Sequence, residues 1–487
     1  MSTSRMAGLA LVAALAAAIS GGAAAKPHRP PSPAPPPPAD PAVVAAALRD
    51  KALDDSTAYG VVESLTTEVG QRLAGTPAAA RAKDWALAKL TALGFSNVHA
   101  EPFAITAWIR GAESAEVTAP YPQTLVIIGL GASPPTPPEG IEAEIALFHS
   151  YADLLAAPPG SLTGKIAVVT QPMTRTQDGA GYGAATRFRR RGPVEAARRG
   201  AVAYLVRSIS TSTSRSPHTG KVDYVADIPK IPAAALGVAD AQLLDRMVAR
   251  GKPVRIRLAL ASTETPGAPA WNVSGDIVGS ERPDEAIVIG GHLDSWDPGQ
   301  GAIDDATGVA ITTAAAKLIG DLPRHPRRTI RVVMFGSEEM DYSGRSYADA
   351  HKADAARLVA LSESDSGPGP IWNLQLPRGA AAATALKPLA SLLAPLKVIL
   401  ADQPAQFAGA DFGELQLEAG VPVFSFTPDT SLYFDVHHSA DDTLDKVGRS
   451  DLNQSVAAWA ALIYLLADSD VDLRALAKAS PAAAPRP

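Results

Sequence analysis

The chain has 487 residues, of which 46% are hydrophobic and 19% are charged, and this composition excludes a wholly disordered protein. Its formal net charge of −6 at pH 7 gives no indication of binding to nucleic acid or another polyanion. The absence of cysteine excludes a disulfide scaffold, thiolate zinc ligands, thioether-linked haem and a cysteine nucleophile.

The first 25 residues have the pattern of an export signal. Arg5 precedes a short apolar stretch at residues 7–19, and the small residues Ala23 and Ala25 match a cleavage site. The stretch is too short and too rich in Ala for a membrane span. We predict a signal peptide at residues 1–25 and export to the periplasm or the extracellular medium, with no membrane attachment after cleavage. An uncleaved anchor is the alternative.

Composition changes divide the rest of the chain, whose length suggests about three domains or two large ones. Helical patterns occur at about 43–68 and 79–93, and the second ends at Gly94, a suitable C-cap. The predicted segments are a Pro-rich linker at 26–42, the first part of a main domain at 43–117, an inserted module at 118–265, the second part of the main domain at 266–475 and a disordered tail at 476–487.

The predicted insert is rich in short β-like runs separated by Pro- and Gly-rich loops. These runs are residues 124–128, 145–148, 166–169 and 202–206. Four arginines at positions 187, 189, 190 and 191 fall in a stretch with loop character. We interpret them as a solvated cluster or one that flanks a helix, and the alternative is a contact with an anionic substrate.

From about residue 270, short apolar runs alternate with helical segments, notably 305–319 and 343–357. The runs, rich in Val, Ile and Phe, are residues 287–289, 330–335, 359–361 and 421–426. Apolar strands that alternate with helices are typical of a parallel sheet covered on both faces. We therefore predict an α/β fold with a mixed, mostly parallel sheet sandwiched by helices and interrupted by the β-rich insert.

Polar side chains follow each of these runs, at the end of the sheet where α/β proteins bind ligands. They are His292 and Asp294 after the first run, Glu338 and Glu339 after the second, Asp365 after the third, and His437 and His438 after the fourth, with Asp304 and Asp305 opening a helix between the first two runs. Each group alone is typical of a turn, a helix start or a solvated surface. Together they predict one site with two imidazoles and at least three carboxylates.

Imidazole and carboxylate ligands without thiolates suit Zn²⁺ or a similar divalent ion. Asp304, Glu339 and Asp365 would repel one another strongly in a cleft, and two divalent ions would neutralise them. Such ions lower the pKa of a shared water, and Glu338 is placed to accept its proton. Motifs for His-Glu-x-x-His metalloproteases, phosphate loops, nucleophile elbows and dinucleotide binding are absent from the sequence.

This ordered set of motifs resembles the co-catalytic dizinc exopeptidases, a family that includes bacterial aminopeptidases, and most closely its plasma glutamate carboxypeptidase (carboxypeptidase Q) branch. The resemblance spans about residues 43–470 and rests on residues 292–305, 337–339, 363–365 and 437–443, with a further likeness at 70–76. It implies a secreted, zinc-dependent metallopeptidase. It also makes the insert a protease-associated domain, for which residues 164–169 are the best match.

The resemblance implies a set of metal ligands, carried over by position. Asp304 would bridge two Zn²⁺ ions, with His292 and Asp365 on one ion and Glu339 and His438 on the other. The peptide bond between Asp304 and Asp305 would be cis, as is common in the family.

The resemblance also implies roles for residues beside the ions. Glu338 would be the general base, and Asp294 would orient the ligand His292. Many relatives have Tyr at the position of His437. His437 would be either the hydrogen-bond donor to a tetrahedral oxyanion or a histidine that contacts the metal ligands without binding a metal ion itself. Asp411 would contact the substrate by holding a free ammonium group, or would only cap a helix.

We expect hydrolysis of dipeptides or short peptides. The alternatives are an aminopeptidase acting on longer peptides, a non-catalytic receptor-like binding protein on the same scaffold, and a reaction like that of glutaminyl cyclases. The resemblance further implies a homodimer, and the expected partner is a peptide substrate and not a nucleic acid.

Overall fold

The computed structural model describes residues 40–479, so the predicted signal peptide and most of the predicted linker and tail lie outside the described residues. The described part forms a main sheet of five strands, a second sheet of eight and a small sheet of three. Its residues 41–42 and 476–479, predicted as linker and tail, are helical. Among these residues, no helix combines the length and the apolarity that crossing a membrane requires.

The main sheet has the strand order β1-β10-β12-β11-β13. Strand β11 pairs in parallel with β12 and β13, whereas β10 is antiparallel to both β1 and β12. This mixed sheet confirms the predicted α/β class, although its parallel part is limited to the three strands that carry the first three of the four apolar runs. The strands are β1 (Ser96–Ile109), β10 (Thr263–Ile277), β11 (Arg282–His292), β12 (Arg328–Phe335) and β13 (Leu358–Glu363).

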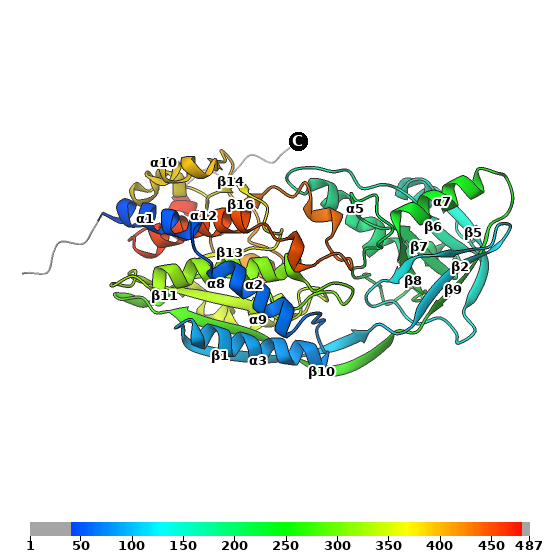
Figure 1. Cartoon of the computed structure of the whole chain (residues 1–487), viewed down its shortest axis with the longest axis horizontal. Coiled ribbons are helices and arrows are strands. Elements are labelled where there is room, and N and C mark those ends of the chain that lie inside the picture. The colour runs from blue at the N-terminus through cyan, green and yellow to red at the C-terminus, as the bar shows by residue number, and fades with distance from the viewer. Residues whose placement is uncertain (1–39, 480–487) are drawn as a thin grey trace, which may run out of the picture. The chain divides into compact units, whose positions relative to one another are not determined.

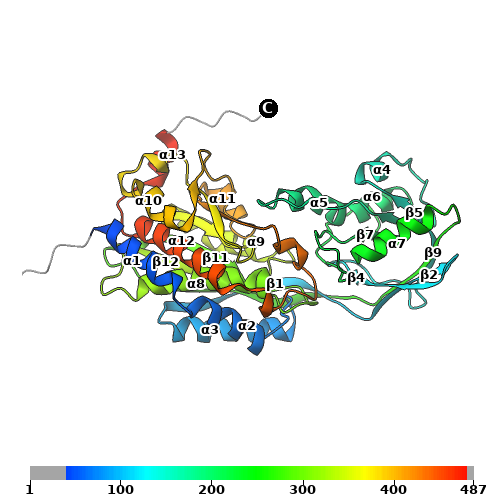
Figure 2. The same cartoon turned by 45° about the horizontal axis from the view of Figure 1, so that its top comes forward.

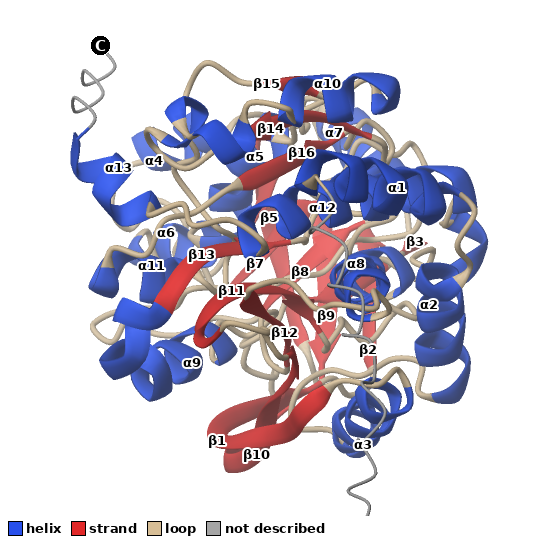
Figure 3. Ribbon diagram, turned by 90° about the vertical axis from the view of Figure 1, so that its left-hand side faces the viewer, coloured by secondary structure: helices blue, strands red, loops and turns tan. Residues whose placement is uncertain are grey.

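Helices cover both faces of the main sheet (Figure 3). Alternate residues of β11 point to opposite faces, so Ile287 and Ile289 pack in the cluster that contains α8 and α12, whereas Ala286 and Val288 pack with residues of α9 and α11. The described helices are α1 (Pro41–Leu53), α2 (Thr57–Glu68), α3 (Pro77–Ala92), α4 (Tyr151–Ala156), α5 (Ala180–Arg190), α6 (Gly192–Arg198), α7 (Val238–Val248), α8 (Thr307–Gly320), α9 (Ser343–His351), α10 (Leu389–Leu393), α11 (Gly413–Ala419), α12 (Arg449–Ala467) and α13 (Leu473–Ala479).

The insert forms the eight-stranded sheet, with the order β3-β2-β9-β5-β6-β7-β8-β4. The long pair β1 and β10 leads into it, and only short connections separate β1 from β2 and β9 from β10 (Figures 1 and 2). The sheet begins before residue 118 and ends before residue 265. Its strands are β2 (Glu113–Ala119), β3 (Gln123–Leu125), β4 (Ile127–Gly129), β5 (Ile141–Phe148), β6 (Ile166–Val169), β7 (Ala203–Arg207), β8 (Ala233–Leu236) and β9 (Arg255–Leu260).

Several predicted elements are divided in the structure. The strand predicted at 124–128 breaks at Val126, whose N–H lies 3.3 Å from Asp240 Oδ2, because β3 pairs with β2 whereas β4 pairs with β8. The helix predicted at 43–68 ends and restarts where Asp55 Oδ1 accepts a hydrogen bond from Thr57 N. The helix predicted at 343–357 continues beyond α9 only as a 3₁₀ helix, Lys352–Arg357.

The run predicted at 421–426 is divided: its last two residues, Ser425 and Phe426, belong to the small sheet, whose order is β15-β14-β16. Only Val423 bridges to the main sheet, through Leu361 of β13. The strands are β14 (Ile371–Gln375), β15 (Ile399–Leu400) and β16 (Ser425–Pro428).

Candidate metal centre

The carboxyl ends of the parallel strands lie at one edge of the main sheet, and the predicted site residues gather there. Strand β11 ends at His292, β12 ends shortly before Glu338, and β13 ends shortly before Asp365. Asp304 lies in the turn Ala302–Ala306 that precedes α8, and the peptide bond that follows it is cis, as expected from the resemblance.

His292 is buried, and its two ring nitrogens have different partners. Nε2 lies 3.0 Å from Asp304 Oδ1 and 3.6 Å from Asp365 Oδ1. Nδ1 lies 3.0 Å from the carbonyl oxygen of Asp294 and 3.5 Å from its carboxylate. Because a carbonyl oxygen only accepts, Nδ1 carries the hydrogen in this bond and Nε2 of the neutral ring is left to bind a metal. Asp294 thus orients His292 chiefly through its backbone.

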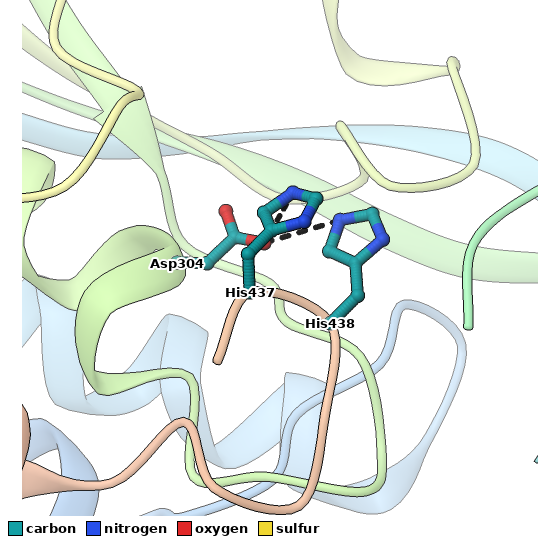
Figure 4. Close-up of side chains that lie close together, drawn as sticks. All are labelled: Asp304, His437 and His438. Atoms are coloured by element: carbon teal, nitrogen blue, oxygen red, sulfur yellow. Dashed lines mark ion pairs between the residues drawn. The ribbon is translucent and has the colours of Figure 1, made fainter. Parts of the chain in front are cut away.

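Asp304 lies between His292 and a pair of stacked histidines. Its Oδ2 is 3.1 Å from His438 Nε2 and 3.4 Å from His437 Nε2, and both rings point toward it (Figure 4). The two imidazoles stack with 3.6 Å between their centroids. Ligand atoms lie within 4.8 Å of one another in two groups that share Asp304, namely His292, Asp304 and Asp365, and Asp304, His437 and His438.

Glu339 and Glu338 complete the acidic side of the cluster. Glu339 Oε2 lies 3.2 Å from His438 Nε2. Buried oxygens of Asp304 and Glu339 have no hydrogen-bond donor among the described residues, which is the environment that a bound cation would satisfy. Burial raises the pKa of Glu338 well above its ordinary value and that of Glu339 to about 7. The residues present therefore fit divalent metal ions.

In the absence of metal, the pKa values of His292, His437 and His438 are shifted in different directions. Burial opposes the charged form of all three, but hydrogen bonds with Asp294 and Asp304 raise the pKa of His292, and the charge of Glu339 raises that of His438. Burial and the neighbouring His438 lower the pKa of His437 well below its ordinary value.

Two buried residues that the sequence reasoning missed hold the loops of the cluster. The carboxylate of Asp442 accepts hydrogen bonds from the backbone N–H groups of Ile303 (2.6 Å) and Asp304 (3.2 Å). The guanidinium of Arg72 donates to the carbonyl oxygens of Leu293, Gln300 and Gly301. Asp442 and Arg72 lie in the segments 437–443 and 70–76, which resemble the family. This resemblance is the only feature of the sequence that points to a role for either residue.

The insert supplies one wall of the cavity that the cluster lines. This cavity has a volume of about 410 Å³ and is lined by Asp304, Glu338, Glu339, Asp365 and both histidines, and from the insert by residues that include Tyr182, Arg189, Arg190 and Lys221. Arg190 and Lys221 pair with Asp341, in the loop that carries Glu338 and Glu339.

The predicted arginine cluster has helical and not loop conformation, because Arg187, Arg189 and Arg190 belong to α5. Arg189 is only 4% exposed. Its guanidinium donates to Thr219 O (3.1 Å) and Tyr182 Oη (3.0 Å), and its Nη1 lies 3.5 Å from His438 Nδ1. Within residues 40–479 it forms no salt bridge with a carboxylate, whereas its neighbour Arg190 pairs with Asp223 and Asp341. The prediction of a solvated cluster is therefore wrong for Arg189.

Asp411 is buried beside the cluster and does not line its cavity. Its Oδ1 accepts a hydrogen bond from Ser343 Oγ (2.5 Å), and its N–H donates to Glu363 Oε2 (3.0 Å). Glu363 itself lines an adjoining cavity of about 300 Å³ together with Asp365.

Comparisons with known proteins identify the family of the chain. A family model described as Peptidase family M28 matches residues 272–463. The chain is 36% identical to carboxypeptidase Q of Bos taurus over 427 residues, which cover 86% of this chain and 88% of that protein. For carboxypeptidase Q of Homo sapiens the identity is 35% over 430 residues, covering 88% and 89%.

Solved structures show the same similarity. The crystal structure of a peptidase M28 precursor from Shewanella amazonensis SB2B matches with a TM-score of 0.86 and 43% sequence identity, covering 89% of this chain and 98% of that one. An aminopeptidase from Aneurinibacillus sp. strain AM-1 shares the fold, with a TM-score of 0.59 at 19% identity. The chain is a metallopeptidase and belongs to peptidase family M28. The resemblance seen in its motifs is confirmed.

The stability of the metal-free protein should depend on pH. Burial raises the pKa of both Glu339 and Asp442 to about 7, above the values of exposed carboxyls. Their contribution to stability is therefore fully present below the unfolded-state pKa values near ~4 and is lost as the pH rises through about 7. We expect the Tm of metal-free protein, measured by calorimetry, to fall between about pH 5 and pH 8. The variant Glu339→Gln should show a smaller fall, and a Tm that rises over this range would contradict the prediction.

Proposed function

We propose that the protein is an exported dizinc exopeptidase that hydrolyses the peptide bond of dipeptides and short peptides. The observation that carries the proposal is the position of Asp304, with Oδ1 3.0 Å from His292 and Oδ2 3.1 Å from His438. A carboxylate whose two oxygens face two different histidines suits a bridge between two metal ions. The N-terminal export pattern supports secretion.

The ligand set favours zinc, because imidazole and carboxylate groups are its usual ligands where thiolates are absent. His292, Asp304 and Asp365 would hold one ion. Asp304 and His438 would hold the other, and both Glu339 and His437 lie close enough to contribute to it. Two roles were predicted for His437, as the donor to an oxyanion or as a histidine that contacts the ligands. Its position adds a third role, as a metal ligand.

Zinc in such a site supplies Lewis-acid chemistry, because it lowers the pKa of water and polarises a carbonyl. Glu338 lines the cavity and its backbone N–H is held by Asp294 Oδ1 at 3.0 Å. Its carboxylate would take the proton of the attacking water and pass it to the leaving amine. Burial raises the pKa of Glu338 well above its ordinary value, which makes its carboxylate a stronger proton acceptor.

The two cavities that meet at Asp365 and Ser366 suit a short zwitterionic peptide. Glu363 Oε1 is buried without a hydrogen-bond donor among the described residues, and suits a free ammonium group. Arg189 lines the other cavity without a carboxylate partner, and a buried cation of this kind is stabilised by an anionic ligand. The proposed substrates therefore have both a free N-terminus and a free C-terminal carboxylate, with Asp411 acting on the ammonium site through Glu363.

The variant Arg189→Gln should lose kcat/KM by about 10–100-fold on a dipeptide with a free carboxylate, since a hydrogen bond to a charged group contributes about 1.5–3 kcal/mol. The loss should be several-fold smaller on the same dipeptide with an amidated C-terminus. Arg187→Gln, on the exposed side of the same helix, is the matched control and should behave like the wild type. An equal loss on both substrates would assign Arg189 a purely structural role.

Product analysis with a panel of dipeptides and tripeptides in the presence of zinc tests the function. Cleavage of unblocked dipeptides that stops on full metal removal would support the proposal, and activity that survives metal removal would contradict it. Release of the N-terminal residue from tripeptides, with dipeptides left intact, would favour the aminopeptidase alternative.

Two further parts of the proposal follow from the resemblance. The insert would be a protease-associated domain, which is supported by its position between β1 and β10 and its separate sheet. The protein would form a homodimer, which sedimentation velocity would test.

A further inference from the structure

The insert contacts the histidine pair of the metal centre through the two-residue segment His218–Thr219. Thr219 N–H donates to the carbonyl oxygen of His438 at 3.0 Å, and His438 Nδ1 lies 3.2 Å from the carbonyl oxygen of Thr219. His218 Nδ1 hydrogen bonds to the carbonyl oxygen of His437. These groups are buried, so three hydrogen bonds between distant parts of the chain meet where little water competes for them.

The bond to Thr219 decides which nitrogen of His438 is free. A carbonyl oxygen only accepts, so Nδ1 of His438 is the donor and Nε2 of the neutral ring keeps its lone pair. Nε2 is the atom that faces Asp304 and Glu339. His292 is oriented in the same way by the carbonyl oxygen of Asp294. The difference is that the partner of His292 is two residues away, whereas the partner of His438 comes from the insert.

The backbone of His438 also needs external support. Its φ of 60° lies in the left-handed region, which residues other than glycine adopt at an energetic cost. Such a conformation persists only where the surroundings hold it. The bonds from His218 and Thr219 to the two consecutive carbonyl oxygens, of His437 and His438, provide that support.

The segment 218–220 is itself fixed to the sheet of the insert. The N–H of His218 donates to Ser208 Oγ (2.9 Å), and Thr219 Oγ1 donates to Gly129 O at the end of β4 (2.8 Å). The N–H of Gly131 donates to Gly220 O (3.0 Å). The second ring nitrogen of His218, Nε2, has no hydrogen-bond partner among the described residues. The contact with His437 is therefore the only hydrogen bond that the His218 side chain contributes within this part of the chain.

We propose that the insert is a working part of the metal centre and that His218 is a positioning residue, which holds the His437–His438 backbone so that His438 presents Nε2 to a metal ion. This inference rests on the proposed function, because it requires that His438 is a ligand. It assigns the insert a role in metal affinity that is separate from any contact with substrate.

The test compares zinc affinity and kinetics in the full-length protein with substitutions at His218. His218→Phe keeps a ring and removes the donor, whereas His218→Asn places an amide N–H near the position of Nδ1. We expect His218→Phe to weaken the binding of the zinc that His438 would hold by about 10–100-fold in a chelator competition, as is usual for partners of metal ligands. Its kcat should fall while KM changes little, and His218→Asn should recover most of both losses.

Two controls keep the test independent of folding defects. His149→Ala removes an exposed histidine of the same insert and should leave zinc affinity unchanged. Ser208→Ala removes the acceptor that holds the His218 N–H without altering the ring, and should weaken zinc binding in the same direction but by less. If His218→Phe does not fold, unchanged zinc affinity in Ser208→Ala overturns the proposal.

The outcomes also separate this inference from the proposed function. A wild-type protein that binds no zinc would contradict the proposed function itself. A wild-type protein that binds two zinc ions, together with a folded His218→Phe variant of unchanged zinc affinity, would overturn only the role of His218. Equal defects in His218→Phe and His218→Asn would also overturn it, because the donor would then not matter.

Discussion

Replacing Glu338 with Gln is expected to lower kcat for a dipeptide by about 10³-fold, within the range found for general acid–base groups. The amide has nearly the shape of the carboxylate but cannot accept the proton of the attacking water. The hydrogen bond that the backbone N–H of Glu338 donates to the Asp294 carboxylate does not involve the Glu338 side chain. The loop should therefore keep its position, and the variant should bind the same amount of zinc as the wild type, measured by elemental analysis.

The matched control for this substitution is Glu281→Gln, a half-exposed carboxylate before β11 and away from the cluster. It should retain wild-type turnover. If Glu338→Gln keeps its zinc and turns over within about tenfold of the wild type, the assignment of the base is wrong.

If Asp304 bridges two zinc ions as proposed, replacing it with Asn is expected to remove measurable activity and to weaken the binding of both ions. The substitution removes the negative charge that lies between His292 and His438. Because the loss of an indirect partner of a metal ligand costs about 10–100-fold in affinity, the loss of a shared ligand should exceed ~100-fold at each ion. Titration of metal-free protein with zinc, followed by calorimetry, measures both affinities.

Asp321→Asn serves as the control for this experiment, since Asp321 lies at the far end of α8 and pairs with Lys317. It should bind the same number of zinc ions as the wild type, with the same affinities. Retention of both ions at unchanged affinity in Asp304→Asn would contradict the bridging role of Asp304.

The three parallel strands of the main sheet and the positions of His292, Glu338 and Asp365 could be predicted because their signals are local. The runs at 287–289, 330–335 and 359–361 are apolar throughout, and such runs form strands that are buried on both faces. Polar residues that follow parallel strands meet at one edge of the sheet. Proximity of His292, Glu338 and Asp365 therefore follows from the order of strands and loops.

The remaining contacts depend on tertiary structure that no local pattern encodes. Arg189 lies in a stretch with several glycines and arginines, which is typical of a solvated segment. Its burial results from packing against Gly220, where a Cβ atom would lie 2.2 Å from the guanidinium carbon. The carbonyl groups of Leu293 and Gln300, to which Arg72 donates, are more than 200 positions away in the chain. His438 is oriented by a backbone carbonyl, a group that every residue has.

The chain enters and leaves the insert through the paired strands β1 and β10, and this arrangement makes the insert removable by protein engineering. Strands β1 and β10 pair up to Ile109 and Thr263, so the excursion of about 150 residues leaves and re-enters at adjacent points, like the loop of a hairpin. A short turn from Ile109 to Thr263 would replace the whole excursion without cutting the main sheet. If the His218–Thr219 contact works as inferred, such a truncated protein would fold and yet hold one ion poorly. Any domain inserted there instead would need to provide a backbone N–H for the carbonyl oxygen of His438 and a carbonyl oxygen for its Nδ1.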